Sequence, residues 1–269
     1  MKVAKPFGYY GGKEALLPEI LPFIPPHSVY CEPFVGGASV FWAKPLADLN
    51  ILNDTNLALY KFYKVASTQP DEFHRAVECT LYHHEEHRRA CEIYRNPEAY
   101  TDLEVAVALF VAVKMSFGKL IGSGFGRVWR NYENCGKGRL YVTYNNAIAE
   151  LPAALAKLRN AQCDNMDAVE LIKRINKKSD DAFMFVDPPY YNANMGHYGG
   201  YTEEDFVRLL DVLAESPHRW MLTCYPNDNY EGRGWEVRYV ESRNASAKTQ
   251  RKTEAIITNY KQNQQLSLL

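Results

Sequence analysis

The stretch at residues 182–190 constrains the fold of this chain most, because a fully apolar run ends there in a rigid polar turn. Five apolar residues, Ala182–Val186, are followed at once by Asp187, two prolines and Tyr190. A short apolar run with aromatic and β-branched members is typical of a strand buried on both faces, and proline ends it. In open α/β sheets, ligands bind beyond the carboxyl ends of the strands. The pattern predicts a binding site there, although Asp and Pro are also ordinary turn residues.

Gly36 and Gly37 form a second constraint, because they follow a predicted strand ending at Glu32 and precede a predicted helix start. This is the first strand-turn-helix pattern of a Rossmann-like sheet. The glycines let a ligand approach the backbone closely, and the Glu32 carboxylate suits a ligand with hydroxyls or an ammonium group. Lys13 follows another Gly-Gly pair but precedes Glu14 rather than Ser or Thr, so a nucleoside triphosphate site is disfavoured.

Asp54 ends the second predicted strand, about twenty residues beyond the glycine turn. At this place α/β folds position a carboxylate on ribose hydroxyls. The same side chain could cap the helix predicted from residue 57, and the two roles can coexist.

A basic, aromatic-rich stretch at residues 114–139 follows a mostly helical region at residues 59–113. The formal net charge of −1 excludes a uniformly basic binder, but phosphate contact depends on where the cations lie. Basic residues interleaved with aromatic residues and glycines fit contact with nucleic acid, whereas a solvated surface is the simpler interpretation. The candidate nucleic-acid contacts are Lys119, Arg127, Arg130 and Arg139.

Neither a metal site nor a disulfide framework is predicted. His83 and His87 are one helical turn apart but lack the His-Glu-x-x-His order, and the six cysteines include no Cys-x-x-Cys pair. We therefore expect reduced cysteines. The sequence also shows no apolar leader and no apolar run of membrane-spanning length, so we expect a cytoplasmic protein without membrane contact.

Four motifs, in one order, resemble those of the Dam-type DNA adenine methyltransferases. They are Tyr-Tyr-Gly-Gly-Lys at residues 9–13, Glu-Pro-Phe-Val-Gly-Gly-Ala-Ser-Val-Phe at residues 32–41, Leu-Asn-Asp-Thr-Asn at residues 52–56 and Val-Asp-Pro-Pro-Tyr at residues 186–190. The order resembles that family's alpha arrangement. The resemblance implies an α/β fold, a Rossmann-like methyltransferase sheet with an inserted, mainly helical target-recognition domain at residues 59–143. Residues 1–58 and 144–269 would then form the two parts of the catalytic domain.

The resemblance further implies methyl transfer from S-adenosylmethionine to the 6-amino group of a flipped-out adenine in double-stranded DNA, without a metal. The enzyme would be bacterial or phage-encoded and would act as a monomer, or as a dimer on DNA. The implied catalytic residues are Asp187, Pro188 and Tyr190. The implied cofactor contacts are Tyr9, Lys13, Glu32, Phe34, Gly36, Asp54, Asp167 and Asp187.

Several alternatives remain open at this point. Methylation of the 4-amino group of cytosine uses the same chemistry, but its motif more often begins with Ser than with Asp. An RNA or small-molecule amine methyltransferase, and a non-catalytic DNA-binding module, are the other candidates. The recognition sequence is also open, because residues 138–144 depart from the Phe-Asn-Val-Pro that family members often carry there.

Overall fold

The structure is a computed structural model that describes residues 5–127, 140–192, 200–243 and 251–261. The chain divides into two compact units. The helical unit comprises residues 1–12 and 56–163, and the sheet unit comprises residues 13–55 and 164–269. Within the described ranges, no helix is both long and apolar enough to cross a membrane.

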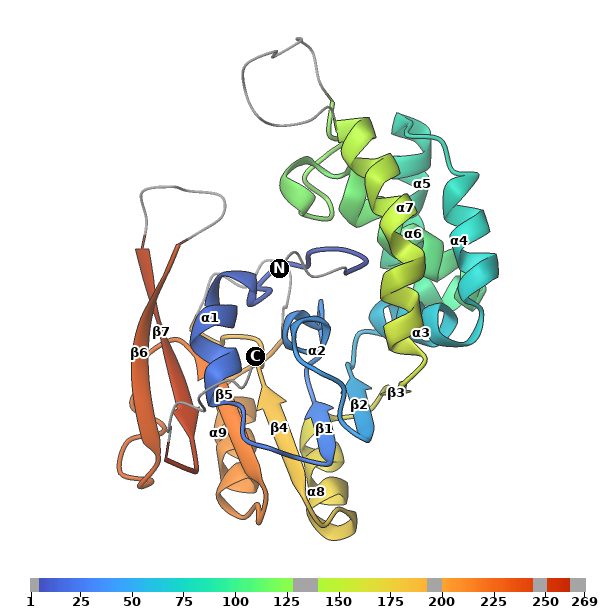
Figure 1. The fold of residues 1–269 in the computed structure, drawn as a ribbon. Coiled ribbons are helices and arrows are strands. Elements are labelled where there is room, and N and C mark those ends of the chain that lie inside the picture. The colour runs from blue at the N-terminus through green and yellow to red at the C-terminus, as the bar shows by residue number, and fades with distance from the viewer. Residues whose placement is uncertain (1–4, 128–139, 193–199, 244–250, 262–269) are drawn as a thin grey trace. The chain divides into compact units, whose positions relative to one another are not determined.

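A seven-stranded sheet in the order β3-β2-β1-β4-β5-β7-β6 organises the fold (Figure 1). Strands β2, β1, β4 and β5 are parallel, while β7 runs antiparallel to both β5 and β6. The chain order of the strands reverses between β1 and β4, which makes their carboxyl ends the switch point where α/β sheets bind ligands. The strands are β1 (Val29–Glu32), β2 (Leu49–Asn53), β3 (Ala161–Asp164), β4 (Ala182–Val186), β5 (Arg219–Cys224), β6 (Glu236–Arg243) and β7 (Arg251–Thr258).

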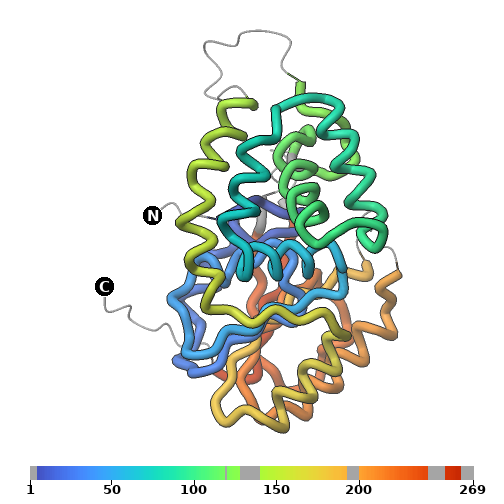
Figure 2. The backbone as a smooth tube through the Cα atoms, turned by 90° about the vertical axis from the view of Figure 1, so that its right-hand side faces the viewer, coloured from blue at the N-terminus to red at the C-terminus, as the bar shows by residue number. Residues whose placement is uncertain are grey.

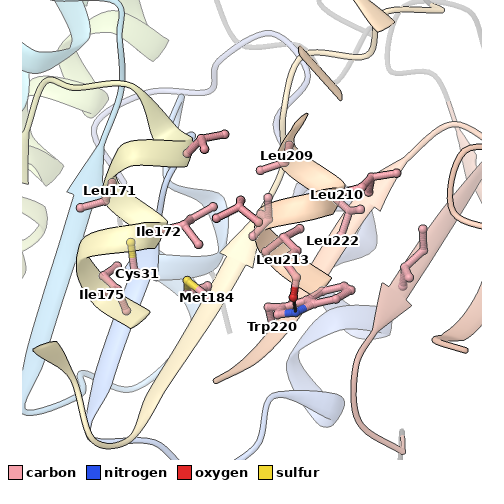
Figure 3. Close-up of a cluster of buried hydrophobic side chains, with 14 of the residues drawn as sticks. Cys31, Leu171, Ile172, Ile175, Met184, Leu209, Leu210, Leu213, Trp220 and Leu222 are labelled. Carbon is pink, nitrogen blue, oxygen red and sulfur yellow. Dashed lines mark hydrogen bonds between the residues drawn. The ribbon is translucent and has the colours of Figure 1, made fainter. Parts of the chain in front are cut away.

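Side chains alternate between the two faces of the central strand β4, and both faces are covered. Met184 and Val186 belong to a core cluster with residues of α8 (Ala168–Lys178) and α9 (Glu203–Ala214) (Figure 3). In the same cluster the Trp220 indole donates a hydrogen bond to the Leu213 carbonyl at 2.9 Å. On the other face, the Phe183 ring contacts the ring of Tyr30. Burial on both faces explains why β4 is apolar throughout and therefore recognisable in the sequence.

The remaining short helices of the sheet unit are α1 (Leu17–Ile20) and α2 (Ser39–Ala43), with 3₁₀ turns at Glu14–Leu16 and Leu21–Phe23. Helix α2 begins directly after the glycine turn that follows β1. This turn therefore lies at the carboxyl edge of the sheet, as the sequence pattern predicts.

The described residues of the helical unit form five α-helices. These helices lie side by side in both views (Figures 1 and 2). Edge-to-face rings join three of them, with centroid distances of 5.5 Å for Phe62–Phe73 and 6.2 Å for Phe73–Phe110. Thr101 and Glu104 form a capping box at the start of α6. The helices are α3 (Leu57–Thr68), α4 (Pro70–Glu78), α5 (His84–Arg95), α6 (Asp102–Met115) and α7 (Leu140–Leu158), with 3₁₀ turns at Pro97–Ala99 and Phe117–Lys119.

The structure confirms the α/β class and the buried strand β4. It corrects the helix cap expected from Asp54: the Asn56 side chain caps α3 instead, accepting hydrogen bonds from the amides of Ala58 and Leu59. Strand β3 was not predicted, because its four residues are polar or half-buried and carry little pattern.

Candidate active site

Asp187 lies directly beyond the carboxyl end of β4, and both of its carboxylate oxygens have partners. Oδ2 lies 2.7 Å from the Lys13 ammonium. Oδ1 accepts a hydrogen bond from the Thr223 hydroxyl at 2.7 Å and a longer one from the Tyr190 hydroxyl at 3.3 Å. The parallel pairing of β4 with β5 brings Thr223 next to Asp187 although 36 residues separate them. These contacts fix the orientation of the carboxyl group.

A second carboxylate, that of Glu254 on β7, adjoins the same cluster. Its Oε2 accepts a hydrogen bond from the Tyr190 hydroxyl at 2.9 Å and lies 3.9 Å from the Lys13 ammonium. The ammonium also lies 4.9 Å from the centroid of the Tyr190 ring. Lys13 therefore stands between two acidic side chains and against an aromatic face. Lys13, Asp187, Tyr190, Thr223 and Glu254 are hereafter called the carboxylate cluster.

Burial dominates the proton equilibria of this cluster. It raises the pKa of Asp187 above its ordinary value, while the charge and hydrogen bond of Lys13 oppose that rise. Burial also raises the pKa of Tyr190, and the charges of Asp187 and Glu254 raise it further. The Tyr190 hydroxyl is therefore a neutral donor near neutral pH. The Lys13 ammonium and the Thr223 hydrogen bond lower the pKa of Asp187 and so favour its charged form.

The loops that follow β1, β2 and β3 are tied together by the buried side chain of Asn53. Its amide group donates to the carbonyls of Pro33 at 2.9 Å and Met166 at 3.0 Å, and its oxygen accepts from the Met166 amide at 3.0 Å. The neighbouring Asp54 carboxylate accepts a hydrogen bond from the Gly36 amide at 3.0 Å. These bonds set the glycine turn against the acidic end of β2.

The glycine turn adopts a left-handed backbone at two positions. Gly36 has a φ of 45°, where a side chain is disfavoured, and Ala38 has a φ of 52° despite carrying one. The hydroxyl of Ser39 at the start of α2 is buried, and no partner is found for it among the described residues. A closely approachable backbone with an unsatisfied buried hydroxyl is the kind of surface that a polar ligand completes.

Glu32 at the end of β1 is directed inward, with an exposed fraction of 2%. Its Oε1 accepts hydrogen bonds from the Tyr30 hydroxyl and the Phe41 amide, both at 2.7 Å. Burial raises the pKa of Glu32 to about 7, against the opposing effect of these two hydrogen bonds. One oxygen of Glu32 thus anchors the chain beyond the glycine turn.

Asp167 and Phe34 flank the same edge of the sheet. Asp167 caps α8 by accepting from the Glu170 amide at 3.1 Å, and its other oxygen lies 2.6 Å from the guanidinium of Arg208. The Phe34 ring packs edge-on against Tyr201, with centroids 6.1 Å apart. The Tyr201 hydroxyl is a second buried group for which the described residues supply no partner. Polar and aromatic groups therefore surround the loops after β1 and β3.

A family model of the D12 class N6 adenine-specific DNA methyltransferases matches residues 9–227, which includes the glycine turn, Asp54 and Asp187. The chain belongs to this family. The resemblance to the Dam-type enzymes, first seen in four motifs, is thereby confirmed. A curated relative is the DNA N-6-adenine-methyltransferase of Escherichia phage P1, which is 28% identical over 226 residues. The alignment covers 79% of this chain but only 28% of the phage protein, so the chain spans less than a third of that relative's length.

Most of the cofactor contacts implied by the resemblance to the Dam-type enzymes lie in the sheet unit. Tyr9 belongs instead to the helical unit, where its hydroxyl lies 3.1 Å from that of Tyr94. The structure brings Lys13, Asp187 and Tyr190 into direct contact, and joins Gly36 to Asp54.

Of the predicted DNA contacts, only Arg127 has a described side chain. It is exposed, and its guanidinium carbon lies 5.7 Å from the centroid of the Phe125 ring. Arg130 and Arg139 lie outside the described residues, as does the side chain of Lys119.

The sequence patterns did not indicate Thr223 or Glu254 as site residues. Thr223 has a weak signal, because it is a polar residue in the otherwise apolar end of a predicted strand. Glu254 has no local signal, since its role depends on β7 pairing with β5. The two histidines considered for a metal have other partners: His83 caps α5, and the buried His87 lies 2.9 Å from the Ser116 hydroxyl.

Proposed function

We propose that this chain transfers a methyl group from S-adenosylmethionine to the 6-amino group of adenine in double-stranded DNA. The observation that carries the proposal is the placement of Asp187 and Tyr190 at the switch point of the sheet, held by Lys13 and Thr223. Membership of the D12 class supports the assignment of adenine as the base.

The residues at the glycine turn fit the proposed cofactor. Gly36 permits close approach of a ligand to the backbone, and Asp54 would accept hydrogen bonds from ribose hydroxyls. The buried, unsatisfied hydroxyl of Ser39 supports a polar ligand at this turn. Further contacts are proposed for Tyr9, Lys13, Glu32, Phe34 and Asp167. When bound, S-adenosylmethionine would supply an electrophilic methyl group on a positively charged sulfur.

The proposed work of the motif at residues 187–190 is to position and polarise the target amine. The lone pair of an adenine amino group is delocalised into the ring, which makes the nitrogen a poor nucleophile. Asp187 and the main-chain carbonyl of Pro188 would each accept one amino hydrogen and favour a pyramidal nitrogen. Tyr190 would offer an aromatic surface to the base, and stacking of this kind contributes about 1–3 kcal/mol. No covalent intermediate with the protein is required.

A base inside a duplex is out of reach of such a site, so the target nucleotide would flip out. We propose that the helical unit contains the target-recognition domain, inserted at about residues 59–143 between catalytic segments at residues 1–58 and 144–269. The exposed cation of Arg127 supports phosphate contact by this region. The proposed contacts also include Lys119, Arg130 and Arg139.

The decisive experiment is incubation of the protein with labelled S-adenosylmethionine and unmethylated genomic DNA. Digestion to nucleosides identifies the product, and long-read sequencing maps the modified positions. We expect N6-methyladenine within one short sequence, and no product from the Asp187→Asn variant. Label on the 4-amino group of cytosine, label on added RNA alone, or DNA binding without transfer would each replace the proposal with the corresponding alternative.

A further inference from the structure

Three donor groups of the protein lie within hydrogen-bond distance of the two oxygens of Asp187. Lys13 occupies Oδ2 at 2.7 Å, a charge-assisted contact that is stronger than a hydrogen bond from a neutral amino group. Thr223 and Tyr190 both donate to Oδ1. An incoming amine must therefore compete with these donors for the oxygens of Asp187. It most easily displaces a donor that has another acceptor nearby.

Glu254 is that other acceptor for two of the three donors. The Tyr190 hydroxyl lies closer to Glu254, at 2.9 Å, than to Asp187, at 3.3 Å. The Lys13 ammonium lies 3.9 Å from Glu254, within ion-pair distance. Between the described residues Thr223 and Glu254 no such contact is found. The Thr223 hydroxyl donates to Oδ1 of Asp187, whereas Lys13 contacts Oδ2. The strand β7 thus brings a carboxylate against the two movable donors of the cluster.

The surroundings of Glu254 hold it in this place. It is nearly buried, with an exposed fraction of 9%, and it precedes the Ala255 that pairs with Cys224 of β5. Two residues earlier on the same strand, the Lys252 ammonium lies 2.8 Å from the Tyr225 hydroxyl, and the Tyr225 ring contacts that of Tyr190 at a centroid distance of 4.6 Å. Alternate residues of a strand share a face, so Lys252 and Glu254 of β7 both support the Asp-Pro-Pro-Tyr motif.

We propose that Glu254 is a positioning residue for methyl transfer. It pairs with the Lys13 ammonium and accepts the hydrogen bond of the Tyr190 hydroxyl, so that Asp187 can accept hydrogen bonds from the target amine. The proposal rests on the proposed function, because it assigns to Glu254 a role at the same site. It requires no movement larger than a change of partner by the Lys13 side chain. Glu254 itself touches neither substrate nor cofactor in this scheme.

The charge of Glu254 leads us to expect a specific change in the pH dependence of the methylation rate when it is removed. Burial raises the pKa of Asp187, Glu254 raises it further, and Lys13 and the Thr223 hydrogen bond lower it. Other charged or titratable groups near Asp187 are Tyr190, Glu32 and Cys224. Removing the charge of Glu254 therefore lowers the pKa of Asp187 and moves the acidic limb of the rate profile to lower pH.

The test compares Glu254→Gln and Glu254→Ala with wild type in single-turnover methylation, at saturating S-adenosylmethionine and DNA. Gln keeps an acceptor for Tyr190 but removes the charge facing Lys13, whereas Ala removes both. We expect the plateau rate to fall about tenfold in the Gln variant and further in the Ala variant. Cofactor affinity should change by less than about twofold, because the lost interaction acts on the target amine.

The matched control is Glu236→Gln, which changes an exposed glutamate at the start of β6 and should leave the rate and its pH profile unaltered. A slower plateau together with an acidic limb at lower pH supports the proposal. Wild-type rates in both Glu254 variants, or a slower rate with an unmoved acidic limb, overturn it. Failure of the wild-type protein to methylate adenine would instead refute the proposed function, so the two failures are distinct.

Discussion

The Lys13 ammonium lies 2.7 Å from the Asp187 carboxylate, although 174 positions of sequence separate the two residues. The first follows the Gly-Gly pair near the N-terminus, and the second ends the central strand β4. The pair lowers the pKa of Asp187 against the effect of its burial. It also places the N-terminal motif in direct contact with the Asp-Pro-Pro-Tyr motif.

Asp187→Asn should lower the single-turnover rate of adenine methylation by at least about a hundredfold, because the amide cannot replace the charged acceptor. Circular dichroism should show an unchanged fold, since Asn has the same shape. Asp180→Asn, which changes an exposed aspartate just before the same strand, serves as the control and should keep wild-type activity. Wild-type-like turnover in Asp187→Asn would sink the proposed mechanism.

Asp54→Ala should weaken the binding of S-adenosylmethionine by about ten- to a hundredfold, the effect of losing charged hydrogen bonds to ribose hydroxyls. Isothermal titration calorimetry measures the change directly. Asp48→Ala removes an exposed carboxylate just before the opposite end of β2 and should leave the affinity unaltered. Equal affinities of the two variants would remove Asp54 from the proposed cofactor site.

Glu32→Gln should flatten the pH dependence of stability between about pH 4.5 and pH 7. Burial raises the pKa of Glu32 from 4.5 to about 7, so the folded state holds the proton more tightly than the unfolded state. The stability that this proton provides is complete below pH 4.5 and is lost as the pH rises through 7.

The difference between the two pKa values corresponds to about 3 kcal/mol in the free energy of unfolding. Denaturant titrations of both proteins at a series of pH values measure it. The stability of Glu32→Gln relative to wild type should increase as the pH rises from 4.5 to about 7. Parallel curves over this range would show that Glu32 does not titrate there.

Arg127→Ala should weaken DNA binding and reduce the slope of log affinity against log salt concentration by about 1, the effect of one lost phosphate contact. Fluorescence anisotropy at several salt concentrations gives the slope. Arg75→Ala, an exposed arginine on α4, provides a comparison within the helical unit. If Arg127→Ala retains the wild-type slope, this side chain does not contact phosphate.

Local sequence patterns were sufficient to predict the parts of the site that lie within one segment. The apolar run of β4 reports burial on both faces, and its abrupt end at Asp187 marks the edge where a site can form. The glycine turn after β1 was recognisable because a left-handed backbone at Gly36 favours glycine. Thr101 was recognisable as a helix cap, because a capping box involves residues only three positions apart.

The tertiary structure alone decided which distant side chains complete the site. Thr223 reaches Asp187 because β5 pairs with β4, and Glu254 reaches Tyr190 and Lys13 because β7 lies beside β5. Strand order and register depend on the packing of the whole sheet, and no short pattern encodes them. The sequence by itself therefore determined the family motifs, whereas the tertiary structure determined the burial of Asp187 and the donors that surround it, because these donors come from distant segments of the chain.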